Sequence, residues 1–247
     1  ILYKKIDTIS LDLHIYKPID FDRNKKYKTV IFFHGGGWKN GYPSYFKRQA
    51  MYFASRGMIA ITPEYRLTEK HGTTPFDCVE DAHDVMNYIK NNAEELNIDT
   101  DWVVAGGGSA GGHLALTTSF WNVSIPFIKA LVLFNPVVDT GPNGFGNNRI
   151  LNRAIEISPI HNINQNHPPT IILVGTEDRI LPVDKVNQFK SLVEKSGGKC
   201  EIVFYKDQKH AFFNNLKYFK DTTHEADKFL SSLGFLIGES SIYSQYK

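Results

Sequence analysis

A serine flanked by glycines, in the run Gly107-Gly108-Ser109-Ala110-Gly111, is the strongest chemical signal in the sequence. The run fits G-x-S-x-G and lies where an expected strand ends and an expected helix begins, a place where a strained turn lifts the serine Oγ above the sheet. Gly107 and Gly111 let strand and helix approach closely. The alternative is a glycine turn that binds phosphate at a helix N-terminus, but the run has no P-loop lysine. We interpret Ser109 as a nucleophile.

A second glycine-rich run, His34-Gly35-Gly36-Gly37-Trp38, directly follows the apolar stretch 29–33. Acyl-transfer enzymes need backbone N–H groups at this place, aimed at the oxygen that becomes negative in the transition state. Taken alone, the run fits a plain glycine turn as well. Two glycine-rich turns at the carboxyl ends of two expected strands, about 70 residues apart, are much more specific than either one. Together they resemble the α/β-hydrolase fold.

The resemblance implies an acid after a late strand and a histidine after the last strand. The stretch Gly175-Thr176-Glu177-Asp178-Arg179-Ile180-Leu181-Pro182 is similar to the family's G-x-x-D-x-x-[VL]-P turn and identifies Asp178 as the acid. Glu177 and Asp184 are competing carboxylates, and both fit solvated turn positions better. His210, which follows the last expected strand and precedes an aromatic residue, is similar to the family's final histidine.

These three residues divide the chemistry of acyl transfer among them. Ser109 is a weak nucleophile by itself, so His210 must take its proton as it attacks the acyl carbon and then return that proton to the leaving alcohol. Asp178 holds the imidazole in the correct tautomer and stabilises the imidazolium without taking the proton.

The resemblance also implies an oxyanion hole, but it does not identify the residues that contact the substrate. The N–H of Ala110, the residue after the nucleophile, is expected to act with those of Gly36 and Gly37. For the substrate wall, Trp38 and the Gly-, Asn- and Pro-rich segment 139–168 are the first candidates, although a tryptophan beside a glycine turn fits core packing equally well.

Short β-rich apolar runs alternate with longer amphipathic stretches, which predicts an α/β fold. We expect one domain over 1–247, with a mostly parallel central sheet, helices on both faces, an antiparallel edge strand or hairpin over 6–16, and 139–168 as a small insertion. Strands are predicted over 29–33, 58–62, 102–105, 128–134, 170–174 and 201–205, and helices over 45–55, from 75 to at least 89, and over 109–120, 183–195 and 218–233.

Composition excludes several other classes of protein. The 247 residues are 42% hydrophobic with a net charge of +2 and interspersed charges, so we expect neither a nucleic-acid partner nor a membrane span. Cys78 and Cys200 are interpreted as buried free thiols rather than a disulfide or metal site. No cofactor fingerprint or metal-ligand cluster occurs in the sequence. Because the chain starts at Ile1 without Met, we expect a trimmed start and leave localisation open.

Both glycine motifs are similar to those of bacterial esterases that act on acylated carbohydrates. Tyr65-Arg66-Leu67, Pro75 and Asp81 match a stretch of these enzymes and of hormone-sensitive-lipase-like esterases, in which we interpret Arg66 and Asp81 as structural. About 30 residues precede the first glycine motif, so a short or absent cap is expected. An open site suits a short acyl group on a bulky polar carrier.

The first functional hypothesis is therefore a serine esterase that removes acetyl or feruloyl groups from carbohydrates. An arylformamidase-like amide hydrolase is the alternative within enzymes, because that family also has a glycine turn and a tryptophan at this position. A catalytically inactive hydrolase fold that serves as a binding module is the alternative outside them. Such modules generally lack one of the three catalytic residues, and here all three are present.

Overall fold

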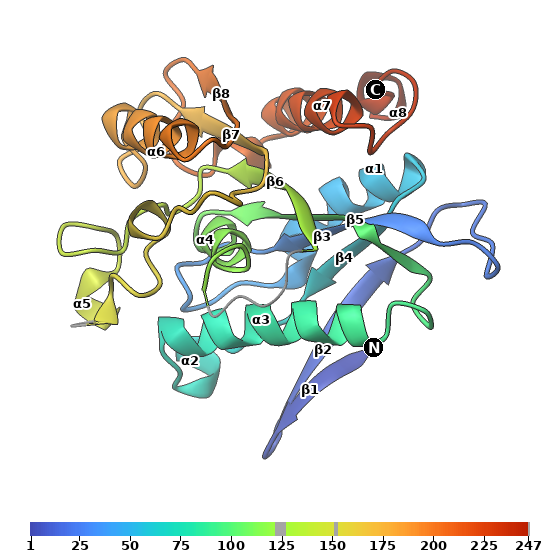
Figure 1. Ribbon diagram of the computed structural model, residues 1–247, viewed down its shortest axis with the longest axis horizontal. Helices are drawn as coiled ribbons and strands as arrows, with labels where there is room; N and C mark the ends of the chain where they lie inside the picture. Colours follow the sequence, from blue (N-terminus) through green and yellow to red (C-terminus); the bar gives the residue numbers. More distant parts are fainter. Residues whose placement is uncertain (122–126, 151–152, 247) are drawn as a thin grey trace.

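An eight-stranded sheet forms the centre of the protein, which is described by a computed structural model over residues 1–121, 127–150 and 153–246. The strand order is β1-β2-β4-β3-β5-β6-β7-β8 (Figure 1). The first two strands form a hairpin whose second strand runs antiparallel to β4, and the pairs from β4 to β8 are parallel. The strands are β1 (Leu2–Ile6), β2 (Ile9–Tyr16), β3 (Tyr27–Phe33), β4 (Ile59–Pro63), β5 (Ile98–Gly108), β6 (Ile128–Phe134), β7 (Thr170–Gly175) and β8 (Cys200–Tyr205).

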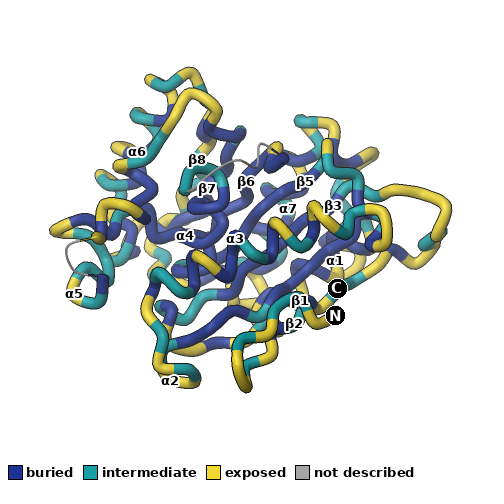
Figure 2. The backbone as a smooth tube through the Cα atoms, turned by 60° about the horizontal axis from the view of Figure 1, so that its bottom comes forward, coloured by how far each residue is buried: buried dark blue, intermediate teal, exposed yellow. Residues whose placement is uncertain are grey.

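Helices cover both faces of this sheet, and each face has its own apolar cluster. One cluster packs α3 (Pro75–Asn91), α4 (Ala110–Thr117) and α6 (Val183–Lys195) against the sheet, and the other packs α1 (Lys47–Ser55), α7 (Leu216–Ser232) and α8 (Ile242–Gln245). The central strands and α4 are buried, whereas α3, α6 and α7 expose residues on their outer faces (Figure 2). The short elements are α2 (Thr68–His71), α5 (Asn147–Ile150), η1 (Pro43–Phe46), η3 (Pro159–His161) and η4 (Phe212–Asn214).

The predicted α/β-hydrolase fold is confirmed, and the differences lie at element boundaries. β5 begins at Ile98 rather than at 102, because the polar residues 99–101 hide the start of the strand from an apolar pattern. The helix after Ser109 ends at Thr117 rather than at 120, and Ser109 itself lies in the turn before it. Within the segment 139–168, a single helical turn forms at Asn147–Ile150, and residues 151–152 lie outside the described residues.

The segment 139–168 is mostly irregular and is fixed to the body by polar contacts. Ile160 donates its N–H to the carbonyl of Val138, and Lys185 of α6 donates from Nζ to Asp139 Oδ2 at 2.8 Å. Arg149 donates from Nη1 to the carbonyl of Gly37, 2.6 Å away. The segment therefore lies against the glycine-rich turn that follows β3.

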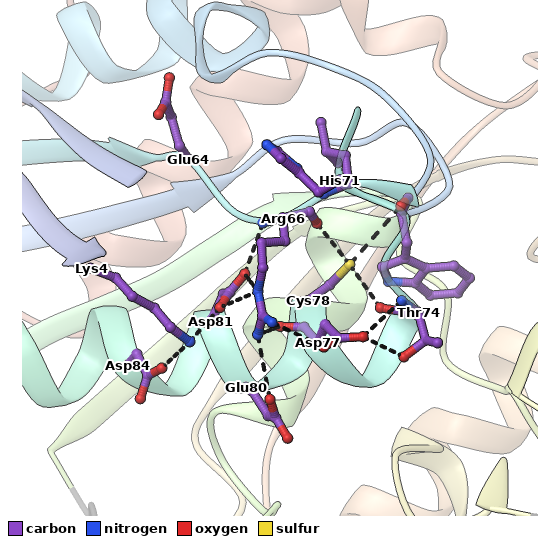
Figure 3. A network of polar contacts seen from close by, with 12 residues as sticks. Lys4, Glu64, Arg66, His71, Thr74, Asp77, Cys78, Glu80, Asp81 and Asp84 are labelled. Atoms are coloured by element: carbon purple, nitrogen blue, oxygen red, sulfur yellow. Dashed lines mark hydrogen bonds and ion pairs between the residues drawn. The ribbon is translucent and has the colours of Figure 1, made fainter. Parts of the chain in front are cut away.

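A network around Asp81 joins the edge hairpin to α3 (Figure 3). Arg66 Nε lies 2.9 Å from Asp81 Oδ2, and Lys4 Nζ lies 2.6 Å from Asp81 Oδ1. Asp81 is fully buried, and its negative charge would be costly there without these cations.

Cys78, one turn before Asp81 in α3, is a buried free thiol, as is Cys200, and burial raises the pKa of both thiols. None of the helices in the described part of the chain is long and apolar enough to cross a membrane.

Candidate active site

Ser109 lies in a sharp turn between β5 and α4 that two glycines make possible. Its φ of 54° and ψ of −121° are values that few non-glycine residues adopt. A Cβ on Gly107 would lie 2.6 Å from the carbonyl oxygen of Gly111, and one on Gly111 would lie 2.1 Å from that of Phe33. Only glycine fits at either position, so the sequence G-x-S-x-G and this turn determine one another.

The structure brings the three predicted residues together in one hydrogen-bonded chain. Ser109 Oγ lies 2.8 Å from His210 Nε2, and His210 Nδ1 lies 2.7 Å from Asp178 Oδ2. The Asp178 carboxylate can only accept, so Nδ1 carries the proton and Nε2 is free to receive one from Ser109. The two competing carboxylates, Glu177 and Asp184, are exposed and make no contact with this chain of bonds.

Asp178 is held by backbone donors on its other oxygen. Its Oδ1 accepts hydrogen bonds from the N–H groups of Ile180 and Leu181, at 2.8 and 3.0 Å, and the residue is only 3% exposed. These bonds lock the orientation of the carboxylate and therefore that of the imidazole.

The glycine-rich turn after β3 lies against Ser109, since a Cβ on Gly35 would be 3.4 Å from the Cβ of Ser109. A Cβ on Gly36, whose φ is 126°, would lie 1.8 Å from the carbonyl oxygen of Asn40, so the turn requires glycine there. Three backbone N–H groups here have no acceptor among the described residues, and they belong to Gly36, Gly37 and Ala110. Free backbone donors on both sides of Ser109 match an oxyanion hole.

His34 fastens the start of this turn. Its Nδ1 lies 2.7 Å from the carbonyl oxygen of Gly35. The ring of Tyr65 stacks on the His34 ring, and the Tyr65 hydroxyl donates to the carbonyl oxygen of His34 at 2.7 Å. Burial lowers the pKa of His34 to about 4, so the ring is neutral near pH 7 and its Nδ1–H donates to Gly35. This histidine supports the backbone and has no contact with the chain of bonds at Ser109.

A mostly apolar cavity of about 320 Å³, which we call the catalytic cavity, opens over Ser109. Aromatic and glycine residues make up most of its wall, and His210 reaches it from the end of β8. The lining residues are Gly35, Gly36, Gly37, Tyr45, Phe46, Gly108, Ser109, Phe145, Ile180, His210, Ala211, Phe213 and Asn214.

Trp38 does not line this cavity, and the segment 139–168 contributes one residue to it. The Trp38 side chain is fully buried against His113 and Phe145, with ring centroids 5.0 and 5.7 Å away. Of the two interpretations left open by the sequence, core packing is correct for Trp38. Phe145 of the segment does reach the cavity wall. His113 is buried, with Nε2 2.7 Å from the carbonyl oxygen of Ile157.

Sequence reasoning missed two polar residues that support the site. Asn135 accepts from the N–H of Ala211, the residue after His210, at 3.0 Å. Its position directly after β6, at the carboxyl edge of the sheet, was a signal that could have found it. Arg149 holds the carbonyl of Gly37 and lies over the ring of Trp38, and no pattern in its irregular segment pointed to it.

Comparison with known proteins gives a consistent set of relatives. The family model described as BD-FAE matches residues 13–129. Among solved structures, apo Thermogutta terrifontis esterase 2 is 36% identical with a TM-score of 0.90, and the match covers 97% of this chain and 96% of that one. The same esterase solved with butyrate bound is 34% identical with a TM-score of 0.89, covering 97% and 95% of the two chains.

Two curated relatives are more distant and longer. Isoprenylcysteine alpha-carbonyl methylesterase ICME of Arabidopsis thaliana is 25% identical over 80% of this chain and 53% of its own length. An acetylxylan esterase of Xylanibacter ruminicola is 23% identical over 76% of this chain and 42% of its own length. The chain thus spans about half the length of these curated relatives.

Proposed function

The chain belongs to the α/β-hydrolase esterases, and from that premise we propose that it is a serine carboxylic-ester hydrolase that removes short acyl groups, acetyl first among them, from carbohydrate esters. The observation that carries the proposal is the chain of two hydrogen bonds, 2.8 and 2.7 Å long, from Ser109 through His210 to Asp178. Ser158, His161 and Asp139 also lie together, but Ser158 Oγ and Asp139 Oδ1 both face His161 Nδ1, at 2.8 and 3.9 Å, so no chain of bonds runs through the two ring nitrogens there.

In the proposed reaction, Ser109 Oγ attacks the acyl carbon while His210 Nε2 takes its proton. The carbonyl oxygen becomes negative and is stabilised by the N–H groups of Gly36, Gly37 and Ala110. When the tetrahedral intermediate collapses, His210 returns the proton to the leaving alcohol. Water activated by the same histidine then attacks the acyl-serine and releases the acid and free Ser109.

The size and character of the catalytic cavity support a short acyl group. About 320 Å³ has to hold the acyl group and the reacting end of the carrier together, which leaves little space for a long chain. Similar structures of Thermogutta terrifontis esterase 2 hold butyrate and propionate. The acetylxylan esterase among the relatives motivates the choice of a carbohydrate carrier.

The first test is a chain-length series of p-nitrophenyl esters, from acetate to octanoate plus an aryl acyl ester, followed by acetylated xylan. We expect activity to peak at the shortest acyl groups and to be lost in Ser109→Ala, with acetate released from xylan. Activity that is equal in wild type and Ser109→Ala would refute the assignment of the nucleophile. Hydrolysis of an N-formyl aryl amide without ester hydrolysis would replace the proposal with an amide hydrolase.

A second test labels the nucleophile directly. Thermogutta terrifontis esterase 2 is phosphorylated by paraoxon. We expect one diethylphosphoryl group on Ser109 of wild type after treatment with paraoxon, located by peptide mass spectrometry, and none on Ser109→Ala. An unmodified Ser109 in wild type would contradict the proposed activation by His210.

A further inference from the structure

A second cavity, of about 300 Å³, adjoins the catalytic cavity. The two share Tyr45, Phe213 and Asn214 as lining residues and therefore lie next to each other. We call the second one the adjoining cavity. Arg48 and Gln49 of α1 form part of its wall. In contrast to the catalytic cavity, this wall carries the cation of Arg48, and it adds the Gln49 amide to the Asn214 amide that lines both cavities.

The Oε1 atom of Gln49 accepts no hydrogen bond from the described residues. The residue is 2% exposed, and its Oε1 is buried without a donor among the described residues. A buried amide without a partner costs free energy, and proteins seldom keep one without reason. A ligand in the adjoining cavity that carries a hydroxyl group would satisfy it, because a hydroxyl can both donate to and accept from an amide.

Arg48 gives the adjoining cavity a positive charge that has no ion-pair partner among the described residues. Its side chain is exposed, its Cζ lies 5.8 Å from the ring centroid of Phe219, and no carboxylate of the described residues lies within 4.0 Å of it. Arg48 and Tyr45 are the titratable side chains among the residues that line the adjoining cavity. A guanidinium in this setting favours a ligand with a carboxylate, which it can bind through two parallel hydrogen bonds.

The adjoining cavity lies on the side of the leaving alcohol. His210 must return its proton to the leaving oxygen, so the carrier has to start within hydrogen-bond reach of His210 Nε2. The residues that follow His210 lead through Ala211 into η4, whose Phe213 and Asn214 line both cavities. A carrier that starts at His210 and continues along η4 enters the adjoining cavity.

We propose that the adjoining cavity binds the alcohol part of the ester, and that this part is a hydroxylated carrier with a carboxylate. The carboxylate accepts from the Arg48 guanidinium, a hydroxyl pairs with the Gln49 amide, and the ring of the carrier lies against Tyr45 and Phe213. This inference rests on the proposed function and adds to it the chemical class of the leaving group.

The kinetic test compares two acetyl esters that differ only in charge, an acetylated methyl glucuronoside and an acetylated methyl glucoside. We expect wild type to prefer the charged ester in kcat/KM by about tenfold, since a charged hydrogen bond has that effect on an equilibrium. Arg48→Gln is expected to bring the ratio of the two kcat/KM values close to one. Lys47→Gln, which removes the neighbouring exposed cation outside the cavity, is the matched control and keeps the ratio.

Gln49→Leu tests the amide with a side chain of similar size. We expect it to lower kcat/KM for both sugar esters several-fold relative to p-nitrophenyl acetate, because that ester has no sugar hydroxyl for the amide to bind. An equal loss for all three esters would assign Gln49 to folding alone and contradict its place in the subsite.

A binding measurement separates failure of this inference from failure of the proposed function. Calorimetry with Ser109→Ala needs no turnover, and we expect methyl glucuronoside to bind more tightly than methyl glucoside, with the difference lost when Arg48→Gln is added. If wild type hydrolyses p-nitrophenyl acetate but the two sugars bind and react equally, the leaving-group inference is wrong and the esterase proposal stands. If wild type hydrolyses no ester and paraoxon leaves Ser109 unmodified, the proposed function fails and the leaving-group role fails with it.

Discussion

Asn135 and Ala211 join the end of β6 to the turn that carries the candidate general base. The Oδ1 atom of Asn135 accepts the N–H of Ala211 at 3.0 Å, and its Nδ2 lies 3.5 Å from His210 Nε2. Asn135 is fully buried and has a φ of 38°, a backbone conformation that is strained for a non-glycine residue. This strained residue lies where its side chain can hold the turn that carries His210. We infer that Asn135 positions His210 relative to Ser109.

Asn135→Gly tests this positioning role while keeping a residue that tolerates positive φ. We expect kcat to fall about 10- to 100-fold with little change in KM, because a small displacement of His210 weakens proton transfer. The control is Asn97→Gly, since Asn97 also has a positive φ, 60°, but lies before β5 at the opposite end of the strand. A loss of thermal stability in Asn135→Gly with unchanged kcat would refute the positioning role.

Asp178→Asn tests the orientation of the imidazole. The amide oxygen can still accept from Ile180 and Leu181, which places the amide NH₂ against His210 Nδ1 and favours the wrong tautomer. We expect kcat to fall by a factor on the order of 10³–10⁴ in steady-state assays, with the fold intact by circular dichroism. Asp184→Asn changes an exposed carboxylate in the first turn of α6 and should retain activity.

Arg149→Met tests whether the segment 139–168 holds the oxyanion turn. Methionine keeps the apolar contact with Trp38 but cannot donate to the carbonyl of Gly37, which Arg149 Nη1 reaches at 2.6 Å. We expect kcat to fall roughly tenfold, because the N–H groups of the turn lose their fixed direction. Arg153→Met removes an exposed arginine of the same segment that pairs with Glu156, and we expect it to behave as wild type. Equal kcat in the two variants would contradict the role of Arg149.

The candidate site could be predicted because its residues follow strands. Ser109, Asp178 and His210 each come directly after an apolar run or a few residues later, and the carboxyl ends of parallel strands meet at one edge of the sheet. The support from Arg149 could not be predicted, since its partner lies 112 residues away and its segment has no periodic pattern. Trp38 was ambiguous because a glycine turn can direct an aromatic side chain inward or outward. Its φ of 60° and its contacts are properties of the folded chain.

Acid is expected to destabilise the protein through His113. Burial lowers the pKa of His113 to about 4, and its buried Nδ1 has no hydrogen-bond partner in the described part of the chain, so the folded state holds the ring neutral. Above the unfolded pKa of about 6.5 both states are neutral, and between that value and 4 the unfolded state binds the proton first. This residue alone should therefore lower the free energy of unfolding by about 2 kcal/mol between pH 7 and pH 5.

Urea titrations of wild type and His113→Gln at several pH values check this pH dependence. Glutamine cannot titrate, so the free energy of unfolding of the variant should fall less steeply between pH 7 and pH 5, even if it is lower at pH 7. His34 and His167, whose pKa values burial also lowers to about 4, remain in both proteins and keep part of the slope. Parallel slopes would mean that His113 is protonated equally in the folded and unfolded states.

Phe145→Ala tests whether the segment 139–168 sets the acyl length. Phe145 lines the catalytic cavity and packs against Trp38 behind it, so removing its ring enlarges the cavity next to Ser109. We expect the ratio of kcat/KM for p-nitrophenyl hexanoate to that for the acetate to rise several-fold, since each buried methylene contributes about 0.8 kcal/mol when it has space. Ile155→Ala truncates a half-exposed residue of the same segment outside the cavity and should leave the ratio unchanged. An unchanged ratio in Phe145→Ala would place the acyl chain on another wall, and Ile180, which lines only the catalytic cavity, would be the next candidate.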